Sequence, residues 1–171
     1  ALFGKVYFPR LIMPLSIVVS NLIRLAIQLS LFIIIWAVYL FKGSSIYPNA
    51  AILYLPLLIV IMAILALGLG MMISALTTKY RDLVFLMTFG IQLFMYATPV
   101  IYPLSSVTGQ LRFLIVANPV THIIETFRYG FTGSGNLDFS MILYSLVASL
   151  FVFFIGLAVF NKVEKSFIDS V

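Results

Sequence analysis

Few residues in this 171-residue chain are equipped for catalytic chemistry. The sequence contains no cysteine, one histidine and five carboxylates, which excludes thiolate chemistry and leaves little for a metal cluster. Phosphate-loop, zinc-hydrolase and serine-hydrolase motifs are absent, and the turn of Gly133, Ser134 and Gly135 has no lysine after it. We therefore expect no catalytic residue, no metal site and no bound cofactor. Any work against a gradient would draw its energy from a separate subunit.

A polar stripe lies within the first apolar stretch of the chain. Asn21, Arg24 and Gln28 are three and four residues apart, which places them on one face of a helix. A charged side chain in hydrocarbon is costly and points to a function, here a polar conduit or a subunit contact. Alternatively, Arg24 snorkels to lipid headgroups, because the stretch would form a helix of about 46 Å against a hydrocarbon core of about 30 Å.

Aromatic and amide side chains recur at helical spacing further along the chain. Phe85, Phe89, Gln92 and Tyr96 share one helix face. Aromatic rings pack against the C–H faces of sugars, and an amide exchanges hydrogen bonds with sugar hydroxyls. The stripe is therefore a candidate substrate path for a glycan, with simple packing between helices as the alternative.

Two further groups of charged residues lie between the apolar stretches. His122, Glu125 and Arg128 are spaced by three, and we expect them to form a solvated face, with headgroup or glycan contact as the alternative. Arg81 and Asp82 occupy a tight turn. Asp82 either favours the start of the following helix through the helix dipole or, with Arg81, contacts a cytoplasmic partner.

The elements that must position these residues are membrane-spanning helices. Apolar residues make up 63% of the chain and charged residues 9%, with a mean hydropathy of +1.20, whereas soluble domains carry about 25% charged residues. We predict an all-α membrane protein, a single transmembrane domain with four spans. The expected segments are an N-terminal elbow at 1–14, spans at about 15–41, 50–76, 83–101 and 139–160, an external segment at 103–138 and a tail at 161–171.

The external segment is too apolar for a plain solvated loop. Asn118 as N-cap and Pro119 in the first turn predict a short helix over 119–129 that stops at Gly130. A second short helix is expected within 105–117. Both are too short to cross a membrane, so we predict a re-entrant or interfacial helical hairpin.

Small residues four apart predict close helix packing in the second and fourth spans. The residues in this pattern are Ala66, Gly70, Ser74, Ser145 and Ser149.

Basic residues give the expected orientation. The net charge of +5 is scattered singly between apolar runs, which indicates topology rather than nucleic-acid binding. With the N-terminus and C-terminus in the cytoplasm, the cytoplasmic side receives more basic residues than the external side. The cytoplasmic set is Lys5, Arg10, Lys79, Arg81, Lys162 and Lys165, and the external set is Lys42, Arg112 and Arg128.

Five segments in this order resemble a known family. They are KVYFPRLIMPLS at 5–16, ALTTKYRDL at 75–83, ATPVIYP at 97–103, ANPVTHIIETFRYG at 117–130 and VEKSFIDSV at 163–171. The chain resembles the permease subunit of type 2 ABC exporters, in the branch that exports lipid-linked polysaccharides such as O-antigen, teichoic acid and capsule-like glycans.

The resemblance implies a six-span permease of the bacterial cytoplasmic (inner) membrane, with this chain supplying the third to sixth spans and lacking the N-terminal third. It implies a homodimer of permeases with two copies of a cytoplasmic ABC ATPase, which binds ATP and magnesium. It also implies that the elbow, with Lys5, Tyr7 and Arg10, contacts that ATPase. Three alternatives stay open: an exporter of a drug, haem or small lipid, an integral membrane transferase, and a structural anchor.

Overall fold

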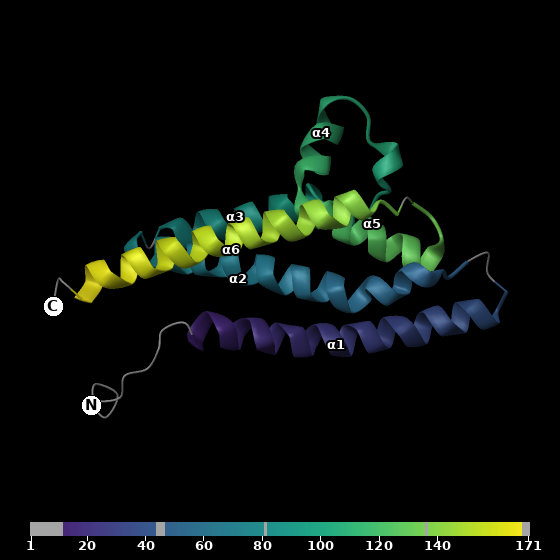
Figure 1. The fold of residues 1–171 in the computed structure, drawn as a ribbon, viewed down its shortest axis with the longest axis horizontal. Helices are drawn as coiled ribbons and strands as arrows, with labels where there is room; N and C mark the ends of the chain where they lie inside the picture. The colour runs from purple at the N-terminus through teal and green to yellow at the C-terminus, as the bar shows by residue number, and fades with distance from the viewer. Residues whose placement is uncertain (1–11, 44–46, 81, 136, 169–171) are drawn as a thin grey trace.

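The computed structural model describes residues 12–43, 47–80, 82–135 and 137–168. Every regular element in these ranges is a helix (Figure 1), which confirms the all-α prediction for this part of the chain. In chain order the elements are α1 (Ile12–Phe41), the 3₁₀ turn η1 (Ala50–Tyr54), α2 (Leu55–Lys79), α3 (Leu83–Tyr96), the 3₁₀ turn η2 (Leu104–Ser106), α4 (Gln110–Ala117), α5 (Pro119–Thr132) and α6 (Phe139–Ile168).

Three helices are long and apolar enough to cross a membrane by length and composition. They lie at Ile12–Phe41, Ala50–Thr78 and Phe139–Val163, with a mean hydropathy of 2.1 to 2.8. The first and last of the corresponding elements, α1 and α6, each contain 30 residues, or about 45 Å at 1.5 Å per residue. Helix α1 begins before the predicted span 15–41, within the predicted elbow. Helix α6 begins where predicted but continues past residue 160 into the predicted tail.

The remaining expected span is shorter than predicted. The interval 83–101 was expected to be helical throughout, but α3 ends at Tyr96 after 14 residues, or about 21 Å. Pro99 explains the end, since it lacks a backbone N–H and disfavours helical geometry in the residue before it. That α3 crosses the membrane remains a prediction.

The most extensive packing between helices joins α2 and α6, which run side by side in the same direction (Figure 1). They cross at Gly68 and Gly156. A Cβ built on Gly68 would lie 2.7 Å from Cα of Phe153, and one on Gly156 would overlap the backbone of Gly68. The predicted small-residue pattern therefore has the wrong register on α2, because a Cβ on Gly70 would meet open space.

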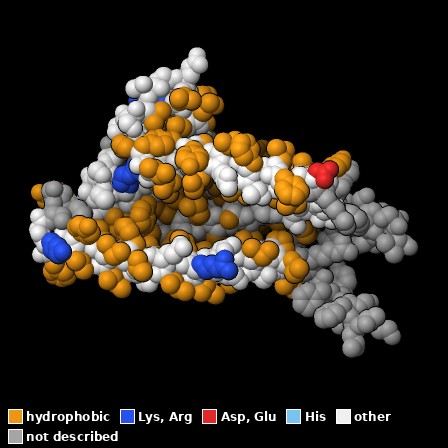
Figure 2. Space-filling view, turned by 180° about the vertical axis from the view of Figure 1, so that it is seen from behind, with side chains coloured by type: hydrophobic (Ala, Val, Ile, Leu, Met, Phe, Trp, Pro, Cys, Tyr) orange, Lys and Arg blue, Asp and Glu red, His pale blue; other side chains and the backbone are white. Residues whose placement is uncertain are grey.

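The core lies where α5 packs between α2 and α6. Leu58, Ile61, Ile123 and Ile142 form the buried cluster. In contrast, α1 and α3 contain no buried residue. Hydrophobic side chains are spread over the described part of the face in Figure 2, and Lys and Arg appear on it only as separate groups. Such a surface suits contact with lipid or with other apolar helices rather than with water.

The predicted pair of short helices is present, with different bounds. Asn118 caps α5 as expected, because its side chain accepts a hydrogen bond from the N–H of Val120. However, α5 continues past Gly130 to Thr132 and ends at Gly133, which adopts the left-handed conformation with φ of 72°. Gly130 lies within the helix, where its small size admits the backbone of η1. The first short helix begins at Gln110 rather than near residue 105.

Candidate functional site

Arg128 connects α5 to the segment that follows α3. Its guanidinium forms an ion pair with Glu125 one turn earlier. It also donates hydrogen bonds to the carbonyl oxygens of Pro99 at 2.7 Å and Tyr102 at 3.4 Å. Glu125 and Arg128 are partly buried, so the expected solvated face is only partly exposed, and Arg128 supplies donors to carbonyls left outside any helix by the two nearby prolines.

Asn118 makes a second connection between the same two segments. Its Nδ2 donates to Oγ1 of Thr98 at 3.0 Å, while its Oδ1 caps α5. Both side chains are buried, and the Thr98 hydroxyl donates onward to the carbonyl of Phe94 in α3. Because both functions of the amide are satisfied by protein groups, Asn118 fixes the start of α5 against the end of α3.

His122 is buried rather than solvated. Its Nε2 hydrogen-bonds to the carbonyl oxygen of Val116 at 2.8 Å, and its ring meets the Tyr144 ring edge-on with centroids 5.6 Å apart. Burial lowers the pKa of His122, and the hydrogen bond to Val116 and the charges of Asp138 and Glu125 offset this only in part. His122 therefore holds the end of α4 against α6 mainly as a neutral ring.

The start of α5 is also bound to α6. Pro119 occupies the first turn of α5, and its carbonyl accepts a hydrogen bond from the Ser145 hydroxyl at 2.8 Å. The Tyr144 hydroxyl donates to the carbonyl of Ala117 at 2.7 Å. The hairpin of α4 and α5 is thus fixed both to the segment that follows α3 and to α6.

An aromatic cluster between α1 and α5 was not found from the sequence. Phe32 and Trp36 of α1 pack on Phe127 and Phe131 of α5, with ring centroids 5.1 to 5.4 Å apart between the helices. The Trp36 indole also donates to the carbonyl of Phe131 at 2.8 Å. The sequence does contain a signal for this contact, because each of the two helices carries a pair of aromatic residues four apart, and the pair on α1 includes the single tryptophan of the chain.

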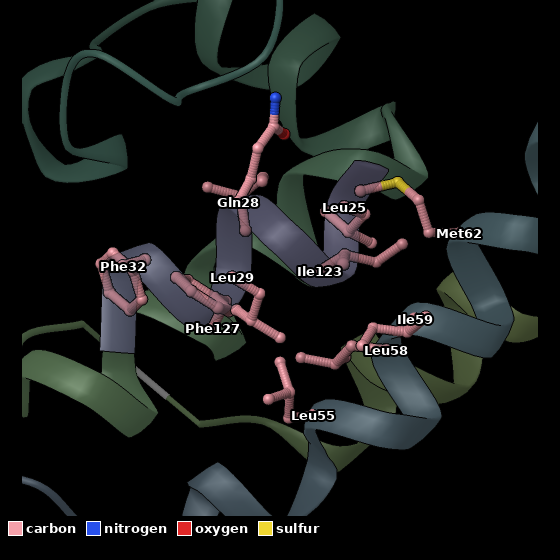
Figure 3. Close-up of a pocket in the computed structure, with 11 residues that line it drawn as sticks. Leu25, Gln28, Leu29, Phe32, Leu55, Leu58, Ile59, Met62, Ile123 and Phe127 are labelled. Atoms are coloured by element: carbon pink, nitrogen blue, oxygen red, sulfur yellow. The ribbon is translucent and has the colours of Figure 1, made fainter. Parts of the chain in front are cut away.

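A groove of about 270 Å³ lies among α1, α2 and α5 (Figure 3). Its lining is apolar apart from Gln28, whose amide extends away from the labelled apolar side chains. Asn21 and Arg24 are exposed on α1, and Arg24 makes no hydrogen bond or ion pair with the described part of the chain. Such a groove suits hydrocarbon, and it contains no polar conduit.

The predicted substrate path is an exposed face of α3. Phe85 is 82% exposed, Phe89 58% and Tyr96 64%, and Gln92 is also exposed. Arg24 does not join them, because α2 packs on both α1 and α3 and lies between them (Figure 1). Within one chain these residues therefore enclose no channel, and the α3 face is free to contact a substrate or another subunit.

Most of the predicted contacts with an ATPase fall on parts that the structure leaves undescribed. Lys5, Tyr7, Arg10 and Arg81 lie outside the described residues. Asp82 precedes α3 and is exposed, and its side chain makes no capping hydrogen bond. Its carboxylate therefore remains accessible at the end of the bundle where α2 ends and α3 begins.

Comparison with known proteins identifies a family model that covers most of the chain. The model described as ABC-2 type transporter matches residues 5–132. This region includes α1 to α5, and thus both the α3 face and the hairpin.

Individual relatives match over nearly the whole chain. The O-antigen export system permease protein RfbA of Klebsiella pneumoniae is 28% identical over 167 residues, which are 96% of this chain and 62% of the relative. The protein of the same name from Myxococcus xanthus is 26% identical, over 99% of this chain and 64% of the relative. The chain therefore spans somewhat less than two thirds of the length of these relatives.

Proposed function

The chain belongs to the ABC-2 type transporter family, and we propose that it forms part of the permease subunit of an ATP-driven exporter of lipid-linked polysaccharide. The observation that carries this proposal is the similarity, along almost the full chain, to permeases named for O-antigen export. The cargo would be an O-antigen, a teichoic acid or a capsule-like glycan. Three apolar helices that are long enough to span a membrane support a membrane location.

The exposed face of α3 supports a path for sugars. Two phenylalanines, one tyrosine and one glutamine lie on a helix without buried residues. In a single copy of the chain, the described residues supply no partner for these exposed aromatic rings or for the side-chain amide. A second permease copy facing this surface would enclose a conduit, in which the rings pack on sugar faces and Gln92 exchanges hydrogen bonds with hydroxyls.

Energy would come from two copies of a cytoplasmic ABC ATPase that binds ATP and magnesium. The elbow residues Lys5, Tyr7 and Arg10 and the turn residues Arg81 and Asp82 would contact it. The start of α3, which Asp82 directly precedes, and the end of α6 lie at the same end of the bundle (Figure 1). Placing this end in the cytoplasm of a bacterial inner membrane follows the distribution of basic residues.

The test is to delete the gene in its host and to measure lipid-linked polymer on each side of the membrane. The proposal predicts that polymer accumulates inside the cell and that the full-length gene restores export. An unchanged amount of surface polymer would contradict it and would favour another cargo, such as a drug, haem or a small lipid. Loss of polymer synthesis without internal accumulation would favour a membrane transferase.

A further inference from the structure

A polar hollow lies between the α4–α5 hairpin and the start of α6. Two adjoining cavities of about 320 and 340 Å³ share Leu104, Arg112 and Glu125 in their linings, so they form one continuous depression, which we call the hairpin hollow. Its charged lining residues are Arg112, Glu125, Arg128 and Asp138. This is the largest gathering of charged side chains in the described part of a chain that has only 9% charged residues.

The four charges differ in how far protein groups satisfy them. Arg128 is engaged by Glu125 and by backbone carbonyls. Arg112 is exposed and makes no hydrogen bond or ion pair with the described residues. Asp138 uses one oxygen, Oδ1, for the N–H and hydroxyl of Ser140. The hollow thus presents a free guanidinium and carboxylate oxygens with spare acceptor capacity.

The balance of these charges selects the kind of ligand. Two guanidinium groups and two carboxylates sum to zero, so an anion meets repulsion from Glu125 and Asp138 and a cation meets repulsion from Arg112. A sugar hydroxyl accepts a hydrogen bond and donates one, so neighbouring hydroxyls bond to a guanidinium and a carboxylate at once.

The walls of the hollow are fixed, and its charges require that it opens to water. Its walls are fixed by the hydrogen bonds of Arg128 to Pro99, Asn118 to Thr98 and His122 to Val116. A preformed site binds without a large cost in ordering its side chains. Charged groups in hydrocarbon are expensive, so the free guanidinium of Arg112 requires that the hollow opens to water rather than to lipid tails.

We propose that the hairpin hollow binds a neutral sugar unit of the exported polysaccharide, with Arg112 donating hydrogen bonds to ring hydroxyls and Glu125 and Asp138 accepting hydrogen bonds from them. The proposal rests on the polysaccharide function proposed above. The hairpin joins the bundle nearer the start of α6 than the end of α6 (Figure 1), and the end of α6 is the side assigned to the cytoplasm above, so the hollow would hold the polymer after it leaves the conduit.

The experiment measures sugar binding by the full-length permease in complex with its ATPase. The probe is a short, lipid-free oligosaccharide cut from the polymer that the host itself makes, and its Kd is measured by equilibrium dialysis. We expect Arg112→Ala to raise the Kd about tenfold, the effect of removing a charge-assisted hydrogen bond. Asp138→Asn should raise it less, because the amide retains one acceptor. Lys42→Ala, which removes another exposed cation outside the hollow, should leave it unchanged.

Three results would overturn the proposal. They are absence of oligosaccharide binding by the unaltered complex, equal Kd values for the unaltered complex and Arg112→Ala, and full competition by inorganic phosphate, which would mark an anion site. Export of polymer by the unaltered permease is recorded in the same strains. Normal export together with any of these results rejects the hollow alone, whereas normal surface polymer in the deletion strain rejects the exporter function.

Discussion

The guanidinium of Arg128 donates a hydrogen bond to the carbonyl oxygen of Pro99 at 2.7 Å across 29 residues of chain. Pro99 is buried and interrupts the helix that α3 would otherwise continue. The bond therefore joins the point where the polypeptide leaves α3 to the second half of α5. This relationship makes Arg128 a structural clamp of the hairpin.

Arg128→Ala should destabilise the hairpin by about 2 to 4 kcal/mol, because it removes hydrogen bonds from a charged donor and leaves Glu125 without its partner. The midpoint of thermal unfolding of the detergent-purified protein should fall, and proteolysis near residues 97–103 should increase. Arg112→Ala is the matched control, since it removes an arginine from the same hairpin that has no partner among the described residues. Equal midpoints for the two variants would contradict a clamp.

Gly156→Ala should destabilise the α2–α6 crossing by about 1 to 3 kcal/mol, the usual cost of overpacking. The added Cβ would overlap the backbone of Gly68, which cannot move without separating the helices. Gly70→Ala is the control, because its Cβ meets open space. Yield of folded protein and thermal midpoint measure the effect. A Gly156→Ala protein as stable as Gly70→Ala would show that the helices do not cross at Gly68.

These two sites show what the sequence could and could not predict. The approximate positions of the helices, the Asn118 cap and the pair of short helices follow from local patterns, and the structure contains them. The pairing of Arg128 with Pro99 depends on residues far apart in sequence. Likewise, Gly68 and Gly70 are equally good small residues in isolation, and only the position of α6 distinguishes them. Local pattern therefore predicted the elements, but not which faces meet.

The same reasoning explains the correction at His122. Because His122 lies three positions before Glu125, the sequence predicts that the two residues share a solvated face. In the structure, residues of α4 and α6 pack on the His122 ring and bury it. The sequence contains no local signal for that cover, because Val116 and Tyr144 contact His122 only after the hairpin has folded back.

Stability should decrease as the pH falls below about 6.5, where an unfolded histidine gains its proton. Burial lowers the pKa of His122 in the folded protein. As the pH falls below about 6.5, the unfolded state therefore binds more protons than the folded state. The contribution of His122 to stability is fully present only above that pH. Asp138, whose pKa is lowered by its hydrogen bonds to Ser140, contributes a decline only near or below about pH 4. The two effects therefore fall in separate pH ranges.

His122→Gln provides the check, because glutamine retains an N–H donor for Val116 without a titrating group. Thermal midpoints of both proteins are measured from pH 7.5 to about 5, the range over which histidine titrates. The decline with acidification should be smaller in the variant. Parallel curves would show that His122 does not control this dependence.

Arg24→Leu separates the two interpretations of the α1 stripe. Arg24 is exposed and has no partner among the described residues, so a conduit or subunit role predicts impaired export or impaired assembly with the ATPase. Arg24→Lys retains a cation on a long stem and should keep any snorkelling contact. Membrane yield, co-purification of the ATPase and surface polymer are measured together. Unaltered behaviour of Arg24→Leu would favour snorkelling.

Phe89→Ala and Tyr96→Ala should each slow polymer export by about threefold to tenfold, because each removes one aromatic surface with an interaction energy of about 0.5 to 1.5 kcal/mol. Both rings are exposed on α3, so their loss opens no internal cavity, and co-purification with the ATPase should be unchanged. Phe154→Ala removes a similarly exposed ring, 62% accessible, from α6 and serves as the control. Export rates equal to that of the control would exclude α3 as the sugar-contacting face and would leave its aromatic residues a role in helix packing.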